Sequence, residues 1–178
     1  LKTQLKTLTG NLIGHNDGFG FLRPDDGSDD IFVPNREMLK AMHGDKVCIK
    51  VILGDKKKRP EAQITEVIKH AQLTLVGRVV YERGMYIVVP EDNRIKHDIV
   101  IPSADLGNAK PEQIVTVEIT DPPTRDTPPI GNIIEVIGGV DEPGIEIEIA
   151  VRKFGIPSQF SFDVLEKAKK LSLKVSSS

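Results

Sequence analysis

The chain has 178 residues, 39% of them hydrophobic and 28% charged, which is ordinary for a folded globular protein and long enough for more than one small domain. No apolar run approaches the length of a membrane-spanning helix and the N-terminus has no hydrophobic signal region, so we expect a cytoplasmic location and no membrane partner. The formal net charge of −2 argues against a nucleic-acid binder driven mainly by electrostatics.

The first distinctive segment, residues 17–24, reads Asp-Gly-Phe-Gly-Phe-Leu-Arg-Pro. Successive side chains of a β-strand point to opposite faces, so Phe19, Phe21 and Arg23 share one face. An Asp-Gly turn joins this strand to a second one as a hairpin, which brings Phe32 beside the other two phenylalanines. An exposed aromatic cluster of this kind is typical of a base-stacking surface. The alternative is an ordinary aromatic core strand.

These strands resemble the two ribonucleoprotein motifs of bacterial cold-shock domains, Lys-Gly-Phe-Gly-Phe-Ile and Val-Phe-Val-His. The resemblance covers roughly residues 8–69. It implies a five-stranded barrel of the oligonucleotide-binding (OB) type that binds single-stranded RNA. The chain departs from the family where Asp17 replaces a lysine and Pro34 a histidine, and it has no tryptophan before the motif. We therefore expect modest affinity from this barrel alone.

Two neighbouring segments add candidate RNA contacts. His15 lies in the turn that enters the aromatic strand, where it could stack or contact phosphate, although a solvated turn histidine fits the sequence equally well. The loop between the expected fourth and fifth strands, which borders the ligand face of such barrels, contains four consecutive cations: Lys56, Lys57, Lys58 and Arg59. These cations are candidate phosphate contacts, and the alternative is a solvated hairpin tip.

Metal and disulfide chemistry are not indicated. The histidines have no metal-ligand spacing, and the single cysteine, Cys48, cannot form an internal disulfide. Four aspartates are dense but fall in the expected hairpin turn, where we expect them to be solvated: Asp25, Asp26, Asp29 and Asp30.

After residue 70 the strand pattern begins again. Residues 84–90 echo residues 18–24, and residues 98–102 echo residues 30–34, at offsets that grow slowly along the chain. Each unit carries five short strands separated by turn signals, which predicts an all-β protein with two tandem five-stranded OB (cold-shock) barrels. We assign these barrels to residues 1–70 and 71–138.

The second barrel has lost the aromatic face. Met85, Ile87 and Val100 stand where the first barrel has its three phenylalanines, and such a face suits packing against a neighbouring domain better than stacking on bases. Arg94, in a turn of this barrel, and Arg125, in a proline-rich loop, are candidate phosphate contacts. The alternative for each is an ordinary surface arginine.

The tandem as a whole resembles the N-terminal half of the ribonuclease R family, a branch of the ribonuclease II family. The resemblance rests on Pro-Thr-Arg-Asp-Thr at residues 123–127 and on Gly-Asn-Ile-Ile-Glu-Val-Ile-Gly at residues 131–138. Residues 158–173 have apolar side chains at helical spacing, which predicts a short amphipathic helix. We expect residues 139–178 to be a linker and the truncated start of a catalytic module.

The resemblance implies a function for the pair of barrels. They would bind single-stranded RNA and guide it to the downstream catalytic domain of a 3′–5′ exoribonuclease, whose chemistry would require a divalent metal such as Mg²⁺. The chain itself has no aspartate cluster after the barrels and no nucleophile–base motif, so we predict no catalytic residue, metal site or cofactor in it.

Two other functions stay open. A stand-alone cold-shock RNA chaperone or translational regulator would explain the motifs but not the predicted helix. A docking module would use the aromatic face to contact protein instead of RNA.

Overall fold

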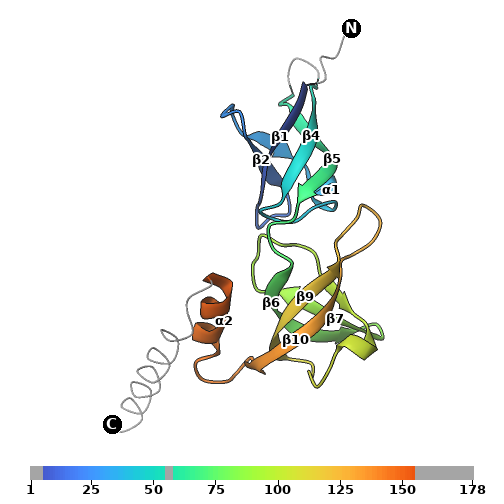
Figure 1. The fold of residues 1–178 in the computed structure, drawn as a ribbon, viewed down its shortest axis with the longest axis vertical. Helices are drawn as coiled ribbons and strands as arrows, with labels where there is room; N and C mark the ends of the chain where they lie inside the picture. The colour runs from blue at the N-terminus through green and yellow to red at the C-terminus, as the bar shows by residue number, and fades with distance from the viewer. Residues whose placement is uncertain (1–5, 55–57, 155–178) are drawn as a thin grey trace, which may run out of the picture.

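The computed structural model describes residues 6–54 and 58–154, which form two closed five-stranded barrels and a helix (Figure 1). The first barrel contains β1 (Lys6–Gly14), β2 (Gly20–Pro24), β3 (Ile31–Val33), α1 (Asn35–Met38), β4 (Lys46–Ile52) and β5 (Glu61–Lys69). The second contains β6 (Thr74–Glu82), β7 (Met85–Pro90), β8 (Ile99–Ile101), the 3-10 turn η1 (Ser103–Asp105), β9 (Gln113–Asp121) and β10 (Ile130–Gly139), and α2 (Ile145–Phe154) follows it. The all-β prediction of two tandem OB-type barrels is confirmed.

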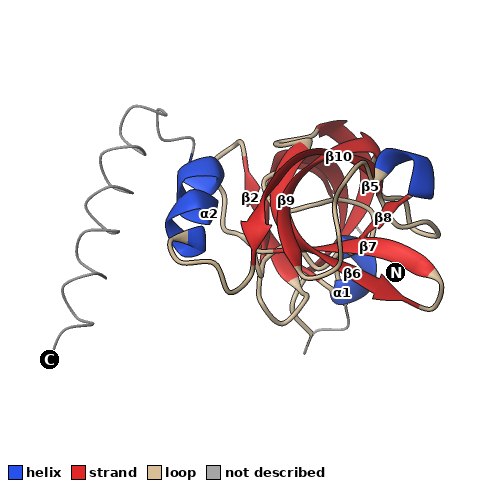
Figure 2. Ribbon diagram, turned by 90° about the horizontal axis from the view of Figure 1, so that it is seen from below, coloured by secondary structure: helices blue, strands red, loops and turns tan. Residues whose placement is uncertain are grey.

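Both barrels have the same topology, as the internal repeat requires. The strand order is β1-β2-β3-β5-β4 in the first and β10-β8-β7-β6-β9 in the second. Each is closed by a short parallel pairing between its third and fifth strands, at Phe32 and Glu61 in one barrel and at Val100 and Ile130 in the other. In the view of Figure 2, the strands curve around to form a closed barrel.

Strand alternation builds each core. In β1, Leu8 and Leu12 point inward while the residues between them are exposed or form the wall. The other fully buried side chains of the first core include Leu22, Val33, Val47 and Ile49, and those of the second include Val79, Val88, Ile99, Val115 and Val117. Because the inward positions are filled by aliphatic side chains, aromatic ones in the first barrel are left for its surface.

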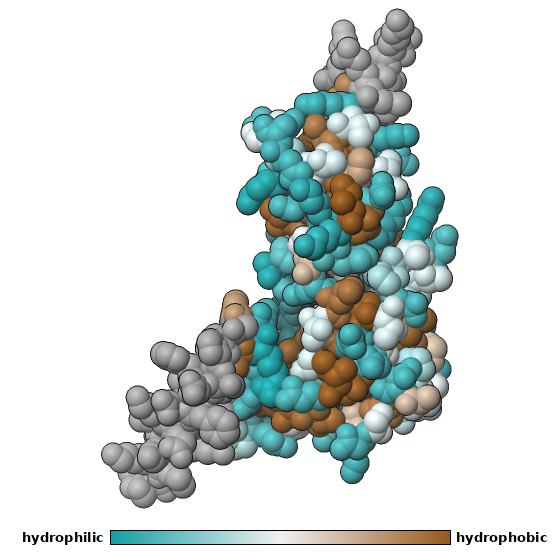
Figure 3. All heavy atoms as spheres, in the orientation of Figure 1, coloured by the Kyte–Doolittle hydropathy of each residue, from teal (hydrophilic) through white to brown (hydrophobic). Residues whose placement is uncertain are grey.

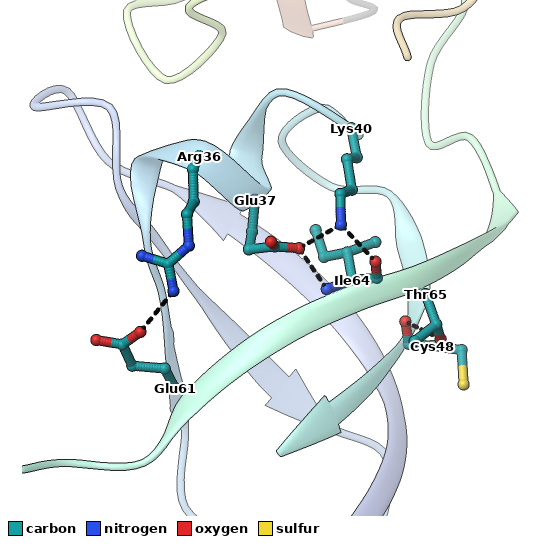
Figure 4. A network of polar contacts seen from close by, with 7 residues as sticks. All are labelled: Arg36, Glu37, Lys40, Cys48, Glu61, Ile64 and Thr65. Atoms are coloured by element: carbon teal, nitrogen blue, oxygen red, sulfur yellow. Dashed lines mark hydrogen bonds and ion pairs between the residues drawn. The ribbon is translucent and has the colours of Figure 1, made fainter. Parts of the chain in front are cut away.

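The short helix α1 closes one end of the first barrel through a buried carboxylate (Figure 4). Glu37 accepts hydrogen bonds from the backbone N–H of Ile64 at 2.8 Å and from Lys40 Nζ at 2.7 Å. Lys40 also donates to the Ile64 carbonyl oxygen at 3.0 Å. Arg36 pairs with Glu61 at 2.9 Å, so three side chains of the helix and the residues after it are tied to β5.

The two barrels share core residues where they meet. Met42 comes from the loop before β4 of the first barrel, yet it is 1% exposed and packs in the hydrophobic cluster of the second barrel with Val79, Val88 and Ile95. Met38, four residues earlier, packs in the first core. The loop between α1 and β4 therefore inserts a side chain from one barrel into the core of the other.

A buried aspartate fixes this loop to the linker between the barrels. Asp45 is fully buried and accepts hydrogen bonds from the backbone N–H groups of Met42 and Ala71, both at 2.9 Å. His70 Nδ1 lies 3.1 Å from the same carboxylate. These contacts join the chain before β4 to the chain that enters β6.

Backbone from the two barrels also comes into direct contact. His97 Nε2 donates to the Leu39 carbonyl oxygen at 3.0 Å. A Cβ atom on Gly14 would lie 2.5 Å from the Arg94 carbonyl oxygen, so a side chain cannot be accommodated there without movement of the backbone. Packing thus crosses the domain boundary expected at residue 70. The boundaries expected at residues 70 and 138 stay predictions.

The prediction of a short helical segment after the barrels is confirmed by α2, which begins at Ile145, earlier than the sequence indicated. Its Ile145 is buried in a small apolar cluster with Val76 and Ile114. Its Arg152 donates two hydrogen bonds to the carboxylate of Glu135 in β10, from Nε at 3.0 Å and from Nη2 at 2.6 Å. The helix predicted over residues 158–173 lies outside the described residues. Within the part of the chain that is described, no helix is long and apolar enough to cross a membrane.

Candidate nucleic-acid interface

The three phenylalanines form one cluster on the outside of the first barrel. Phe19 precedes β2, Phe21 lies on β2, and Phe32 on β3 is its cross-strand partner. Their ring centroids are 5.8, 5.6 and 6.0 Å apart, and each ring is half-buried. Leu22 and Val33 fill the inward positions of these strands. The predicted cluster is confirmed, and the core-strand alternative is wrong.

Two further residues cover the ends of the cluster. The His15 imidazole stacks on the Phe19 ring, with centroids 4.3 Å apart and planes inclined by 10°. The Arg59 guanidinium lies over the Phe32 ring at 5.0 Å from its centroid, which is a cation–π contact. His15 and Arg59 therefore lie beside the aromatic face, and their contacts with RNA stay predictions.

The remaining basic candidates of the first barrel are on the surface. Arg23 is exposed and lies 3.6 Å from Asp30, a pairing that contributes little to stability because water screens both groups. Lys58 is exposed next to Arg59, whereas Lys56 and Lys57 lie outside the described residues. The structure thus leaves Arg23, Lys58 and Arg59 accessible to phosphate, and their role in binding stays a prediction.

The candidates of the second barrel lie away from the phenylalanines. Arg94 sits at the junction, where its Nε and Nη2 donate to Asp92 at 2.9 and 2.8 Å. This guanidinium lowers the pKa of Asp92 to about 2, so the pair is charged at neutral pH. Arg125 is exposed and lines a separate groove of about 330 Å³ with Leu39 and His97. Neither arginine joins the aromatic cluster.

The second barrel presents an apolar but non-aromatic face, as predicted. Ile87 and Val100 are cross-strand partners and half-buried, and Met85 is 51% exposed. An unpredicted aromatic contact joins Tyr81 and Tyr86 at the end of the β6–β7 hairpin, with ring centroids 4.7 Å apart. In the view of Figure 3, hydrophobic surface forms small patches among hydrophilic residues on both barrels.

A cavity of about 310 Å³ lies between the second barrel, the linker and α2, and each of its two arginines is already held by carboxylates. Arg94 is held by Asp92, and Arg152 by Glu135 and Glu148. No group of three or more His, Cys, Asp or Glu side chains suited to a metal ion occurs among the described residues. The aromatic face of the first barrel is therefore the better candidate site.

A groove with a volume of about 460 Å³ adjoins the aromatic cluster at the end of the first barrel. Phe21 and Phe32 line it together with Asp29, Asp30 and Arg59. The expectation that all four aspartates of the β2–β3 turn are merely solvated is therefore incomplete. Sequence spacing gave no signal for this arrangement, because the groove is closed by residues from β1, β4 and the loop before β5.

Comparison with family models finds one match in each barrel. Residues 10–67 match the model described as the ribonuclease B OB domain, and residues 87–161 match the model described as a cold shock domain. The aromatic motif thus lies in the part matched as the OB domain, and the cold shock match begins within β7 of the second barrel and extends past β10.

Among curated proteins, the chain is 36% identical over 170 residues to ribonuclease R of Acidithiobacillus ferrooxidans, covering 94% of this chain and 39% of the relative. It is 38% identical over 157 residues to ribonuclease R of Escherichia coli K12, covering 88% of this chain and 19% of the relative. The chain therefore spans well under half the length of these relatives.

Among solved structures, the fold is similar to that of Mycoplasma genitalium RNase R. The apo form aligns with a TM-score of 0.72 at 20% identity, covering 84% of this chain and 24% of that chain. The same enzyme in complex with ribose-methylated single-stranded RNA aligns with a TM-score of 0.70 at 20% identity, covering 81% and 23%. This similarity supports the tandem-barrel fold.

Proposed function

The chain has the N-terminal domain pair of the ribonuclease R family, an OB domain followed by a cold shock domain, and we propose that this pair binds single-stranded RNA. One observation carries the proposal: the ring centroids of Phe19, Phe21 and Phe32 lie within 6.0 Å of one another on the barrel surface. Each stacked base contributes about 1 to 3 kcal/mol, and stacking accepts any base. A solved relative, Mycoplasma genitalium RNase R, is in complex with single-stranded RNA.

Phosphate contacts come from cations whose present partners are easily exchanged. Arg23 lies 3.6 Å from Asp30 with both groups exposed, so replacing the carboxylate by a phosphate costs little. Arg59 can leave the Phe32 ring to a base and contact the adjoining phosphate, since a cation–π contact at an exposed site contributes only about 0.5 to 1 kcal/mol. Such contacts add affinity without sequence preference.

In the whole protein we propose that the barrels guide RNA to a catalytic module with 3′–5′ exoribonuclease activity. The relatives are named ribonuclease R, and the chain covers 39% and 19% of the two described above. The second barrel would orient the first, because Met42 of one barrel packs in the core of the other. The divalent metal would belong to that module, because the described residues assemble no metal-ligand group. A cytoplasmic location is part of the proposal.

The test is the affinity of the chain for a fluorescently labelled single-stranded oligoribonucleotide, measured by anisotropy. The triple substitution Phe19→Ala/Phe21→Ala/Phe32→Ala should weaken binding by about 100-fold or more, because it removes stacking for at least two bases. The matched control, Met85→Ala/Ile87→Ala/Val100→Ala, changes the equivalent positions of the second barrel and should leave the affinity nearly unchanged.

Circular dichroism and melting curves must show that both variants are folded. Unchanged affinity in the phenylalanine variant would refute stacking as the mode of binding. Absence of binding by the unsubstituted chain even at low salt would refute RNA binding by this fragment and favour a protein-docking role for the aromatic face.

A further inference from the structure

Three of the four histidines lie at or beside the junction of the two barrels. His43 belongs to the loop between α1 and β4, His70 to the linker after β5, and His97 to the loop before β8. Histidine changes its charge close to neutral pH, and its neutral and cationic forms offer different hydrogen-bonding atoms. Contacts made by these side chains can therefore depend on which form is present.

The contact that His43 makes is available only to the neutral ring. Its Nδ1 atom accepts a hydrogen bond from the backbone N–H of Gly14 at 3.0 Å. An imidazolium carries a hydrogen on both ring nitrogens and accepts no hydrogen bond. Protonation of Nδ1 therefore breaks this bond and leaves the Gly14 N–H without its acceptor.

This part of the first barrel lies directly against the second. A Cβ atom on Gly14 would lie 2.5 Å from the Arg94 carbonyl oxygen and 3.4 Å from the His43 Cβ atom. His43 and Arg94 also line a space of about 10 Å³ with Met42 and His97, which is no larger than one water molecule needs. Because the packing is this close, a movement of His43 or Gly14 changes the contact between the barrels.

Two effects oppose a positive charge on His43. Burial is the larger one, and the Arg94 guanidinium of the second barrel adds to it, so the pKa of His43 is lowered. Asp92 and Asp45 act in the opposite direction without outweighing these two effects. The other charged side chains that line the cavity beside His43 are Glu91, Arg152 and Lys153. When the barrels separate, water reaches the ring and Arg94 moves away, so the separated form binds a proton more readily.

The other two histidines keep their contacts when they are protonated. His97 Nε2 donates to the Leu39 carbonyl oxygen across the junction at 3.0 Å, and a proton on Nδ1 does not remove that donor. His70 Nδ1 lies 3.1 Å from the Asp45 carboxylate, a contact that a proton on the ring preserves. His43 is therefore the one of the three whose contact is lost on protonation.

We propose that His43 positions the two barrels and releases them in mild acid: the neutral ring holds Gly14 at the junction, and the cation raises the population in which the barrels are apart. The inference goes beyond the proposed RNA binding, because it concerns the orientation of the barrels rather than the aromatic face. Met42, which packs in the core of the second barrel, opposes separation in both protonation states. Acid therefore loosens the junction without unfolding the barrels, whose aliphatic cores do not titrate.

Amide hydrogen exchange tests the proposal at about pH 7.5 and about pH 5.5, on either side of the ordinary pKa of histidine. Protection factors are compared, since they remove the intrinsic effect of pH on exchange. The reporters are the amides of Met42 and Ala71, which donate to Asp45 and not to His43. Their protection should fall about fivefold at the lower pH, which is the factor that one net hydrogen bond provides. Amides in the middle of β4 and β9 should stay protected.

Three variants show whether His43 is responsible. His43→Gln keeps an acceptor for Gly14 but cannot become charged, so it should retain the protection of both reporters at the lower pH. His43→Ala has no acceptor and should give low protection at both pH values. The matched control, His15→Gln, changes the histidine that stacks on Phe19 and should keep the fivefold response.

Equal protection of the two reporters at both pH values in the unsubstituted chain would overturn the role of His43, and so would a fivefold fall in His43→Gln. Loss of protection throughout β4 and β9 would also overturn it, because acid would then unfold the barrels instead of parting them. RNA affinity at the higher pH, measured by anisotropy, is independent of these outcomes and tests the proposed function alone.

Discussion

Replacing Met42 by alanine tests whether the two barrels share a core. Met42 is 1% exposed and belongs to the hydrophobic cluster of the second barrel, although it lies in the chain of the first. Methionine-to-alanine changes at such positions cost about 2 to 5 kcal/mol, depending on how far the cavity collapses. We expect the free energy of unfolding to fall by about 3 kcal/mol, because the backbone of the loop is held by Asp45 and cannot follow the lost side chain.

The three methionines of the chain provide a matched series. Met38 is 8% exposed in the core of the first barrel, and Met85 is 51% exposed on the second. Met38→Ala should also be destabilising, whereas Met85→Ala should stay within about 0.5 kcal/mol of the unsubstituted chain. Urea unfolding gives these differences, and about 3 kcal/mol corresponds to a melting temperature lowered by about 6 to 12 °C in a chain of this size.

Amide hydrogen exchange then shows which barrel is weakened. Met42→Ala should accelerate exchange in β6, β7 and β9 more than in β1 and β4, and Met38→Ala should do the opposite. If Met42→Ala weakens only the first barrel, or costs less than about 0.5 kcal/mol, the shared core does not exist in solution and the barrels are joined by the linker alone.

Two further predictions concern charged groups that hold neighbouring elements. Arg152→Gln should accelerate amide exchange in α2 and raise the pKa of Glu135, which the arginine now lowers. The substitution should cost about 1 kcal/mol, because water still reaches part of the pair. Unchanged exchange in α2 would show that its apolar contacts suffice. Burial and the nearby Arg94 lower the pKa of His43, opposed by Asp92 and Asp45, and His43 Nδ1 accepts the backbone N–H of Gly14 at 3.0 Å. The unfolded chain therefore binds a proton on His43 more readily than the folded chain does, so the free energy of unfolding should fall as the pH drops below about 6.5 toward the lower folded-state pKa. His43→Gln keeps a hydrogen-bond acceptor and should flatten the pH dependence of the urea midpoint. An equally steep dependence in this variant would contradict the role given to His43.

The barrels and the aromatic cluster were predictable because their signals are local. Alternation along each strand marks its inward side chains, and the two-residue spacing of Phe19 and Phe21 already places them on one face. The internal repeat then supplied the second barrel from the first. Phe32 needed only the register of one hairpin to be brought beside the other two.

Contacts between distant segments could not be predicted in this way. Nothing in the spacing of Met38 and Met42 indicates that they enter different cores, because that depends on the second barrel closing against the loop between α1 and β4. The histidines are another example. His43, His70 and His97 are scattered in sequence, yet each makes a contact at or beside the barrel junction.

The position of helix α2 was not predicted, for a different physical reason. Its first half alternates isoleucine with glutamate, a period of two that is typical of a strand rather than a helix. Tertiary contacts override this preference: Ile145 packs with the outer side of the second barrel, and Arg152 joins Glu148 one turn earlier to Glu135 on β10. Such a helix is specified by the barrel that it covers.

The loss of the aromatic face in the second barrel is consistent with a division of roles between two copies of one fold. A chain with a net charge of −2 gains little from long-range attraction to phosphate, so stacking would supply much of the proposed affinity for RNA. Stacking acts only over short distances and requires a fixed platform. The first barrel carries the platform, and the second, which receives Met42 in its core and closes against Gly14, would hold that platform in a fixed orientation.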